Sequence, residues 1–181
     1  GADSGESNNV VIGNSAGGSI NDADSDSNVI MGYNAGHGGT GELDRCIAIG
    51  AYAMDGTGTV SGQQNIFIGD NAGGGSWTTA ASNSNVAIGA TAMSAALNGA
   101  LGNTTVGHDG LKALTSGDNN VAIGRAAGTA VTSGYNNSLV GAYAGDAITT
   151  GESNTALGYA ALSSEDTGTR NVAIGNEALK D

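Results

Sequence analysis

Hydrophobic positions recur along this chain within one short phrase: Asn, an apolar residue, a small or apolar residue, an aliphatic residue, and Gly. The phrase occurs ten times, with copies that begin at Asn9, Asn28, Cys46, Asn65, Asn85, Asn103, Asn120, Asn137, Asn154 and Asn171. Successive phrase glycines lie 19, 18, 19, 20, 18, 17, 17, 17 and 17 residues apart. The chain is therefore a tandem array whose period becomes regular in its second half.

Each phrase predicts a short β-strand. Its centre, for example Val121-Ala-Ile123, is rich in β-branched residues, is too short for a helix and is bounded by Asn and Gly. A strand of about four or five residues leaves room for two strands and two turns per coil, whereas helical repeats need about 33 residues or more.

We therefore predict an all-β fold, a parallel β-solenoid of about ten coils of 17–20 residues, in a single domain spanning residues 1–181. Longer, irregular coils occupy about residues 8–106, and regular 17-residue coils occupy about residues 107–179. Coils stacked at about 4.7–4.9 Å would make a rod about 45 Å long.

Two further columns follow the same period. The third residue after each phrase glycine is Ala in nine copies and Gly110 in the other, and Gly, Met or Leu comes next. In the regular half, Gly117, Gly134, Gly151 and Gly168 form another column. We expect these four to be turn glycines, since a positive φ carries no steric cost for glycine.

Alternation along the strand divides the phrase between two faces. The fourth residue is aliphatic in all ten copies, so we expect the second and fourth residues to line the interior. The third residue would then point outward, yet it is also apolar, with Thr105 as the sole exception. Strands that are apolar on both faces need cover on both, and soluble monomers rarely expose such a continuous stripe. We expect a cyclic homo-oligomer; the alternative is a monomer that folds its own loops over the stripe.

Composition and charge narrow the possible functions. Aromatic residues make up 4%, there are 33 glycines, and proline is absent, which fits a thin interior and a backbone committed to a hydrogen-bonded ladder. The net charge of −12 excludes nucleic acid as a partner and disfavours an anionic membrane surface.

No apolar run approaches the ~20 residues that span a bilayer, so we expect no membrane insertion. Cys46, the only cysteine, is expected to be a small buried side chain rather than a reactive thiol.

The Asn column permits two roles. Stacked side-chain amides could pair from coil to coil at about 0.5–1.5 kcal/mol net per bond, or each Asn could occupy a turn position that tolerates a left-handed backbone. Both roles are structural, and they apply to Asn9, Asn28, Asn65, Asn85, Asn103, Asn120, Asn137, Asn154 and Asn171.

No motif predicts catalysis or a cofactor. His37 and His108 lie in different coils without a matching Ser or Cys phrase. Asp22, Asp24 and Asp26 alternate as calcium ligands do, but the twelfth position of such a loop is not Glu, so we favour a solvated acidic loop. We expect no enzyme activity, no metal and no cofactor.

Two other features suggest surface contacts. Trp77 lies in the longest spacing, and an aromatic loop residue is a candidate contact for a sugar or a partner protein, although packing over a coil edge is the alternative we favour. Thr115, Thr132 and Thr149 stack at period 17, a pattern that suggests ice binding, but the column lasts only three coils.

The recurrence of Asn-Val-Ala-Ile-Gly followed by Ala-Gly or Ala-Leu resembles the head repeat of trimeric autotransporter adhesins of the YadA type. Residues 150–162 and 166–175 also resemble repeats of phage tail-fibre and related trimeric fibre proteins. The resemblance covers about residues 8–179, although the adhesin head repeat is shorter than 17 residues. It implies a left-handed parallel β-roll, a bundle of three chains, and a role in surface display or host attachment.

We accordingly expect a non-enzymatic structural and attachment module, part of a larger extracellular protein on a cell surface or virion, with loops that bind a glycan or another surface receptor. The alternative is a monomeric carbohydrate-binding or ice-binding solenoid. A polysaccharide-degrading solenoid is disfavoured because no clustered carboxylates recur at coil spacing.

Overall fold

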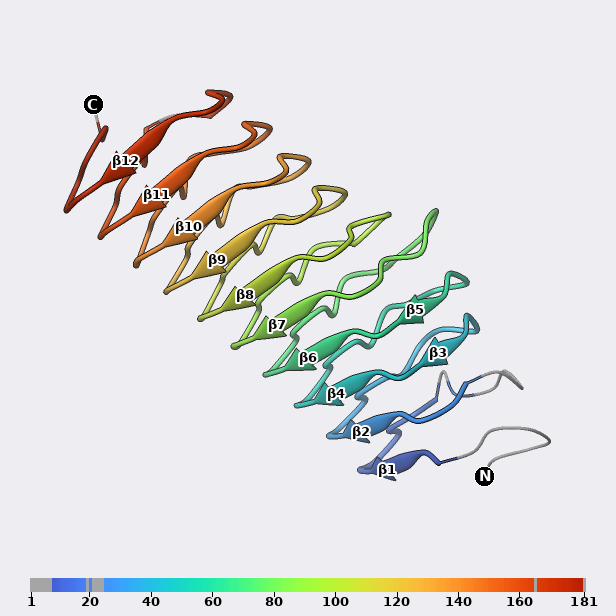
Figure 1. The fold of residues 1–181 in the computed structure, drawn as a ribbon. Coiled ribbons are helices and arrows are strands. Elements are labelled where there is room, and N and C mark those ends of the chain that lie inside the picture. The colour runs from blue at the N-terminus through green and yellow to red at the C-terminus, as the bar shows by residue number, and fades with distance from the viewer. Residues whose placement is uncertain (1–7, 19, 21–24, 165, 181) are drawn as a thin grey trace.

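The structure, a computed structural model, describes residues 8–18, 20, 25–164 and 166–180. Within them the chain contains no helix and winds into a parallel β-solenoid of about nine turns, whose coils stack along one axis from the N-terminus to the C-terminus (Figure 1). The predicted all-β solenoid is thus confirmed.

Each phrase contributes one three-residue strand to a ten-stranded parallel sheet. In order, the strands are β1 (Val10–Ile12), β2 (Val29–Met31), β4 (Ile47–Ile49), β6 (Ile66–Ile68), β7 (Val86–Ile88), β8 (Thr104–Val106), β9 (Val121–Ile123), β10 (Ser138–Val140), β11 (Thr155–Leu157) and β12 (Val172–Ile174). Strands pair in phase although the spacings differ: Val10 pairs with Val29 and Thr104 with Val121. The extra residues of the first half therefore lie outside this sheet.

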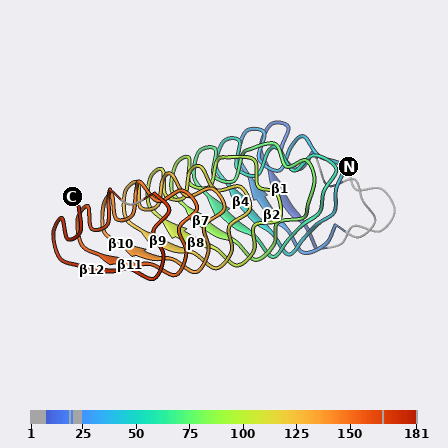
Figure 2. The ribbon, with the colours of Figure 1, turned by 90° about the horizontal axis from the view of Figure 1, so that it is seen from above.

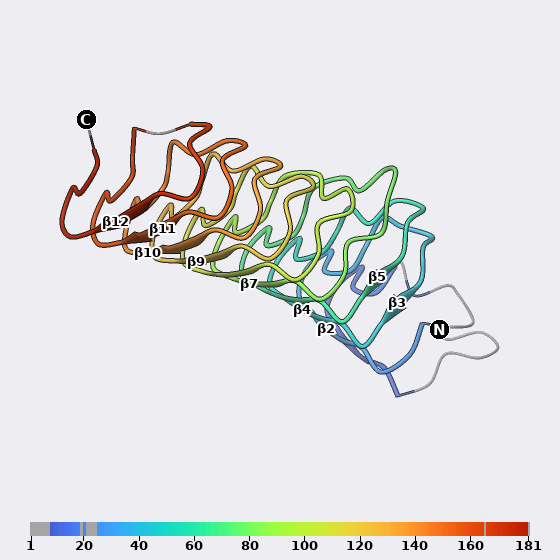
Figure 3. The same cartoon turned by 45° about the horizontal axis from the view of Figure 1, so that its top comes forward.

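A second strand per coil is the exception. β3 (Leu43–Asp44) and β5 (Gly62–Gln63) pair with each other, and a single bridge joins Gly39 to Gly58. The other described segments outside the main sheet are turns, bends and irregular backbone (Figures 2 and 3). The period leaves room for a second strand in every coil, but in the described residues only β3 and β5 use it.

The phrase glycine is required where neighbouring coils approach. Gly124 has a φ of +135°, and a Cβ there would collide with the carbonyl oxygen of Gly141 in the next coil. The glycine column of the regular half also lets neighbouring coils approach closely, since a Cβ on Gly117 would collide with the carbonyl oxygen of Gly134. None of Gly117, Gly134, Gly151 and Gly168 has a positive φ, so our reason for these glycines was wrong.

The third residue of the phrase, and not the second and fourth, faces the interior. Phe67, Ala87 and Leu139 are fully buried, whereas Ile12 and Ile123 are 56% and 43% exposed. Our assignment of the two faces is therefore wrong. The fourth residue of the phrase, which is aliphatic in every copy, lies on the outside of the coil. The third residue lies in the interior, and its side chain varies widely in size.

The interior tolerates this variation because the residue four places after the phrase glycine compensates. A large third residue is accompanied by Gly, as in Ile30 with Gly36, Phe67 with Gly73 and Leu139 with Gly145. A small third residue is accompanied by a buried Met or Leu, as in Ala48 with Met54, Ala87 with Met93, Thr105 with Leu111 and Ala156 with Leu162. A Cβ on Gly145 would lie 2.7 Å from Cδ2 of Leu139, so the two positions share one volume.

Ala122 is the one interior Ala in the regular half whose coil has Gly at the compensating position, Gly128. A Cβ on Gly128 would lie 2.8 Å from Cδ1 of Leu139 and 2.9 Å from Cδ2 of Leu111. Side chains from the two neighbouring coils therefore occupy the space that a larger residue would have filled.

Candidate functional site

The Asn column is a hydrogen-bonded ladder inside the solenoid. Nδ2 of Asn120 donates to the carbonyl of Gly134 at 2.8 Å, while its Oδ1 accepts two bonds from Asn137. Asn28, Asn65, Asn85, Asn103, Asn137 and Asn154 are likewise buried, and Asn9 and Asn171 join the ladder at its ends. The left-handed residue is the preceding one, for example Asn119 with a φ of 56°. The amide ladder is thus the role observed.

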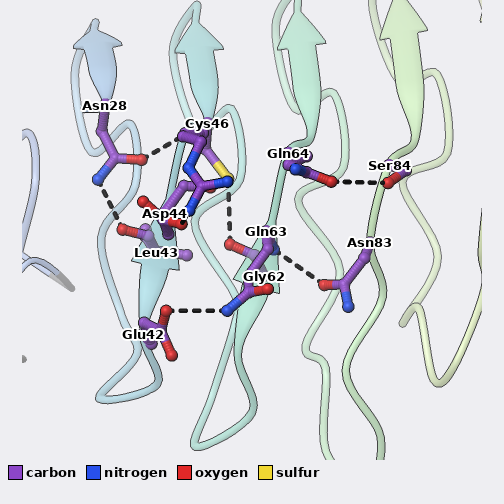
Figure 4. Close-up of polar contacts among 11 residues, drawn as sticks. Asn28, Glu42, Leu43, Asp44, Cys46, Gly62, Gln63, Gln64, Asn83 and Ser84 are labelled. Atoms are coloured by element: carbon purple, nitrogen blue, oxygen red, sulfur yellow. Dashed lines mark hydrogen bonds and ion pairs between the residues drawn. The ribbon is translucent and has the colours of Figure 1, made fainter. Parts of the chain in front are cut away.

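Cys46 replaces one rung of this ladder (Figure 4). Its backbone N–H donates to Oδ1 of Asn28 at 2.8 Å, as an Asn in its place would, and its thiol donates to the carbonyl of Gly62 at 3.1 Å. Burial raises the pKa of the Cys46 thiol to about 11, and the backbone N–H of Asn65 partly opposes the shift. The expected small buried side chain is confirmed.

The second and fourth residues of each phrase, which are the first and last residues of each main strand, form one continuous surface, which we call the outer face. Three of its twenty positions are Thr104, Ser138 and Thr155. The remaining seventeen are aliphatic: Val10, Ile12, Val29, Met31, Ile47, Ile49, Ile66, Ile68, Val86, Ile88, Val106, Val121, Ile123, Val140, Leu157, Val172 and Ile174. Val106, Ile123 and Leu157 are each more than 40% exposed, so no described loop of the chain folds over them.

The corner that follows each main strand lies at the lower left of Figure 1. Several of its residues are aromatic or charged. In the coils of β8 to β11 these are His108, Asp109, Lys112, Arg125, Tyr143 and Tyr159, which we call the C-terminal corner. Cζ of Arg125 lies 5.6 Å from the ring centroid of Tyr143. The rings of Tyr143 and Tyr159 are 5.9 Å apart and meet at 78°.

Asp109 is an acid of this corner, and its carboxylate is engaged within the chain. It accepts from the hydroxyl of Thr91 at 2.7 Å and pairs with Lys112 at 2.9 Å and His108 at 2.7 Å. The Thr91 hydrogen bond, followed by that from Lys112, holds the pKa of Asp109 below its ordinary value. Its negative charge is therefore largely compensated by its neighbours.

A second tyrosine pair lies at the same corner near the N-terminus. The rings of Tyr33 and Tyr52 are 5.3 Å apart and meet at 85°. Desolvation raises the pKa of Tyr52, with contributions from Tyr33 and from the negative charges of Asp55 and Asp70. The two pairs are similar in geometry, but Arg125 lies over a ring of the C-terminal pair, whereas the negative charges of Asp55 and Asp70 act on Tyr52.

Trp77 is not at the surface. It is fully buried, and its ring packs edge-on against Phe67 with centroids 6.0 Å apart. Trp77 is therefore not a surface contact; it packs, as we favoured, but in the interior rather than over a coil edge. The interior has room for the indole because Gly62 lies against it: a Cβ there would be 2.8 Å from Cζ3 of Trp77.

The hydroxyl column that suggested ice binding is used within the chain. Oγ1 of Thr115, Thr132 and Thr149 donates to the main-chain carbonyl of Thr132, Thr149 and Asp166 respectively, at 3.0–3.1 Å. These hydroxyls point along the solenoid axis to the next coil. They stabilise the stack, and they are not an unengaged row facing solvent.

The acidic loop is only partly described, because Asp22 and Asp24 lie outside the described residues. Within the described ranges, no group of three or more His, Cys, Asp or Glu side chains is arranged to hold a metal ion. His108 pairs with Asp109 rather than with a nucleophile.

Comparisons with protein-family models, with curated proteins and with solved structures found no match. In the part of the chain that is described, no helix has the length and apolar character needed to cross a bilayer. The chain is thus a β-solenoid repeat protein with two distinctive surfaces, the outer face and the C-terminal corner.

Proposed function

We propose that this chain is a non-enzymatic structural and attachment module of a trimeric surface adhesin or of a viral or phage tail fibre, displayed outside the cell or virion. The outer face is the observation that carries the proposal. Its aliphatic residues do not serve the chain's own core, which is built by the third residue of each phrase. They need a partner surface that excludes water.

The extent of the outer face supports this requirement. Two aliphatic columns over ten strands make a face about 45 Å long and about 10 Å wide, on the order of the largest patches that soluble monomers expose. Three copies with their long axes side by side would bury these columns in a closed assembly. The need for a partner comes from the exposed face, and the number three comes from the resemblance of the phrases to trimeric fibre repeats.

The test compares two substitutions at equally exposed aliphatic residues. Ile123 on the outer face and Leu101 outside it are each 43% exposed. We expect the wild-type chain to have three times the monomer mass of 17.4 kDa in native mass spectrometry. Ile123→Asp should release monomers, because a carboxylate in a dry interface lacks compensation, whereas Leu101→Asp should leave the trimer intact.

A well-folded wild-type monomer at micromolar concentration would refute the trimer. Equal disruption by the two substitutions would remove the outer face as its cause.

A further inference from the structure

We propose that the C-terminal corner binds a glycan whose terminal sugar carries a single carboxylate, such as a uronic or sialic acid. This inference deepens the proposed attachment function by naming a ligand class and a site. All residues of the site belong to one chain, so no residue of a second copy is needed to complete it.

Charge is the first argument. The chain has only 5 Lys and Arg against 17 Asp and Glu, yet Lys112 and Arg125 both lie at this corner together with His108. Lys112 and His108 are about half exposed, and Arg125 is exposed. Lys112 and His108 are paired with Asp109, and Glu177, beside Tyr159, is paired with Lys180. Asp146 lies in the coil of Tyr143, so the attraction for a carboxylate rests on Arg125. Arg is well suited to a carboxylate because its guanidinium can make two parallel hydrogen bonds.

The tyrosines supply the second part of a sugar site. Tyr159 is 50% exposed. Arg125 lies over the ring of Tyr143, so its side chain is already partly ordered and loses less conformational entropy when it binds a ligand. A pyranose presents an apolar C–H face that packs on an aromatic ring, while its hydroxyls bond to phenol oxygens. The two rings pack edge to face at 78°, so they do not form a flat shelf for a long polymer, and the exposed Tyr159 ring is left to stack on one terminal sugar.

The field of the whole chain restricts the ligand further. A net charge of −12 repels a polyanion, such as a sulfated polysaccharide or a run of acidic residues, along its whole length. A sugar with one carboxylate and otherwise neutral hydroxyls gains the contact with Arg125 without that repulsion. A glycan with one acidic sugar is therefore favoured over an acidic peptide.

The Tyr33–Tyr52 pair provides a control within the same molecule. It has nearly the same ring geometry at the same corner of the coil, and Asp55 occupies in its coil the position that Asp146 occupies in the coil of Tyr143. The difference between the pairs is Arg125, which lies over the ring of Tyr143. If exposed tyrosine alone sufficed for binding, both pairs would bind sugar. If the cation is needed, only the C-terminal corner would bind an acidic sugar.

Saturation-transfer NMR on the soluble protein is the test, with the methyl glycosides of N-acetylneuraminic acid, glucuronic acid and galactose as probes. We expect an acidic glycoside to bind and galactoside to bind at least about tenfold more weakly, as expected from one charge-assisted contact. Arg125→Gln and Tyr159→Ala should each weaken binding of the acidic sugar about tenfold. Tyr33→Ala should leave it unchanged, and thermal melts verify that all three variants are folded.

The proposal fails if no acidic sugar binds, if galactoside binds equally well, or if Tyr33→Ala is as damaging as Tyr159→Ala. Binding of a Glu-rich peptide in the absence of sugar binding would overturn it in favour of a protein ligand. Native mass spectrometry of the same samples separates the two proposals: a monomer that binds acidic sugar refutes the trimer alone, and a trimer that binds none refutes this inference alone.

Discussion

Asn137 places two hydrogen bonds on a single oxygen of Asn120: its backbone N–H and its side-chain Nδ2 lie 3.1 Å and 2.9 Å from Oδ1. The Nδ2 of Asn137 also donates to the carbonyl of Gly151 at 2.9 Å. Each amide therefore joins the coil before it to the coil after it. In a solenoid, whose coils contact only their neighbours, this local connection sets the stability of the whole stack.

Replacing Asn137 with Ala should destabilise the chain by about 2–4 kcal/mol, because the backbone N–H of Asn154 and the carbonyl of Gly151 would lose partners in a buried site. Urea denaturation measures the loss. Asn171, which joins the ladder by donating its backbone N–H to Asn154, is the matched control. Asn171→Ala should change stability by less than about 0.5 kcal/mol, and equal losses at both positions would contradict the role of the ladder.

The phrase glycines allow a similar comparison. Gly124 and Gly175 have nearly the same φ, +135° and +131°, so Ala at either position incurs similar backbone strain of about 1–3 kcal/mol. A Cβ on Gly124 also collides with the backbone of Gly141, whereas a Cβ on Gly175 has its nearest neighbour at 3.8 Å. We expect Gly124→Ala to lower the thermal midpoint far more than Gly175→Ala. Equal shifts would show that φ alone, and not coil contact, requires glycine here.

The repeat, the strand and the amide ladder could be predicted because each leaves a constant residue type at a constant spacing. The interior face could not be predicted in this way. We took the constant aliphatic fourth position as the core, but a core position may change size whenever a neighbour compensates, as Phe67 with Gly73 and Ala87 with Met93 do. The third residue of the phrase is large where the residue four places after the phrase glycine is Gly, and small where that residue is Met or Leu. This inverse relation in size is the signal in the sequence that identifies the interior.

The C-terminal corner escaped prediction for a related reason. Arg125 and Tyr159 directly follow their phrase glycines, whereas Tyr143 is the second residue after its own, so the three do not form a column in the sequence. Trp77 was misplaced because it lies in the longest spacing, where no other copy supplies a reference. Both cases depend on packing between coils, which periodicity alone does not describe.

Volume sharing inside the coil predicts a rescue. Leu139→Ala should cost about 2–5 kcal/mol, as expected for a buried Leu. Gly145→Leu alone should also destabilise, because its Cβ would lie 2.7 Å from Leu139. The double variant reproduces the combination of Ala156 and Leu162 in the next coil and should be more stable than either single variant. A double-mutant cycle from urea denaturation measures the coupling, and additive effects would contradict shared volume.

The buried thiol of Cys46, which stands where the other phrases have Asn, should make the free energy of unfolding fall at alkaline pH. The pKa of its thiol is about 11 in the folded chain against an ordinary 9.0. Below pH 9 both states keep the proton; between pH 9 and 11 the unfolded chain releases it first, so folding stability falls as pH rises, by about 2–3 kcal/mol in total. Cys46→Asn removes this titration and supplies the absent amide. Urea denaturation across this pH range should show wild-type stability falling relative to Cys46→Asn, since the tyrosines titrate in both proteins. Parallel pH profiles for the two would show that the buried thiol does not govern the alkaline loss.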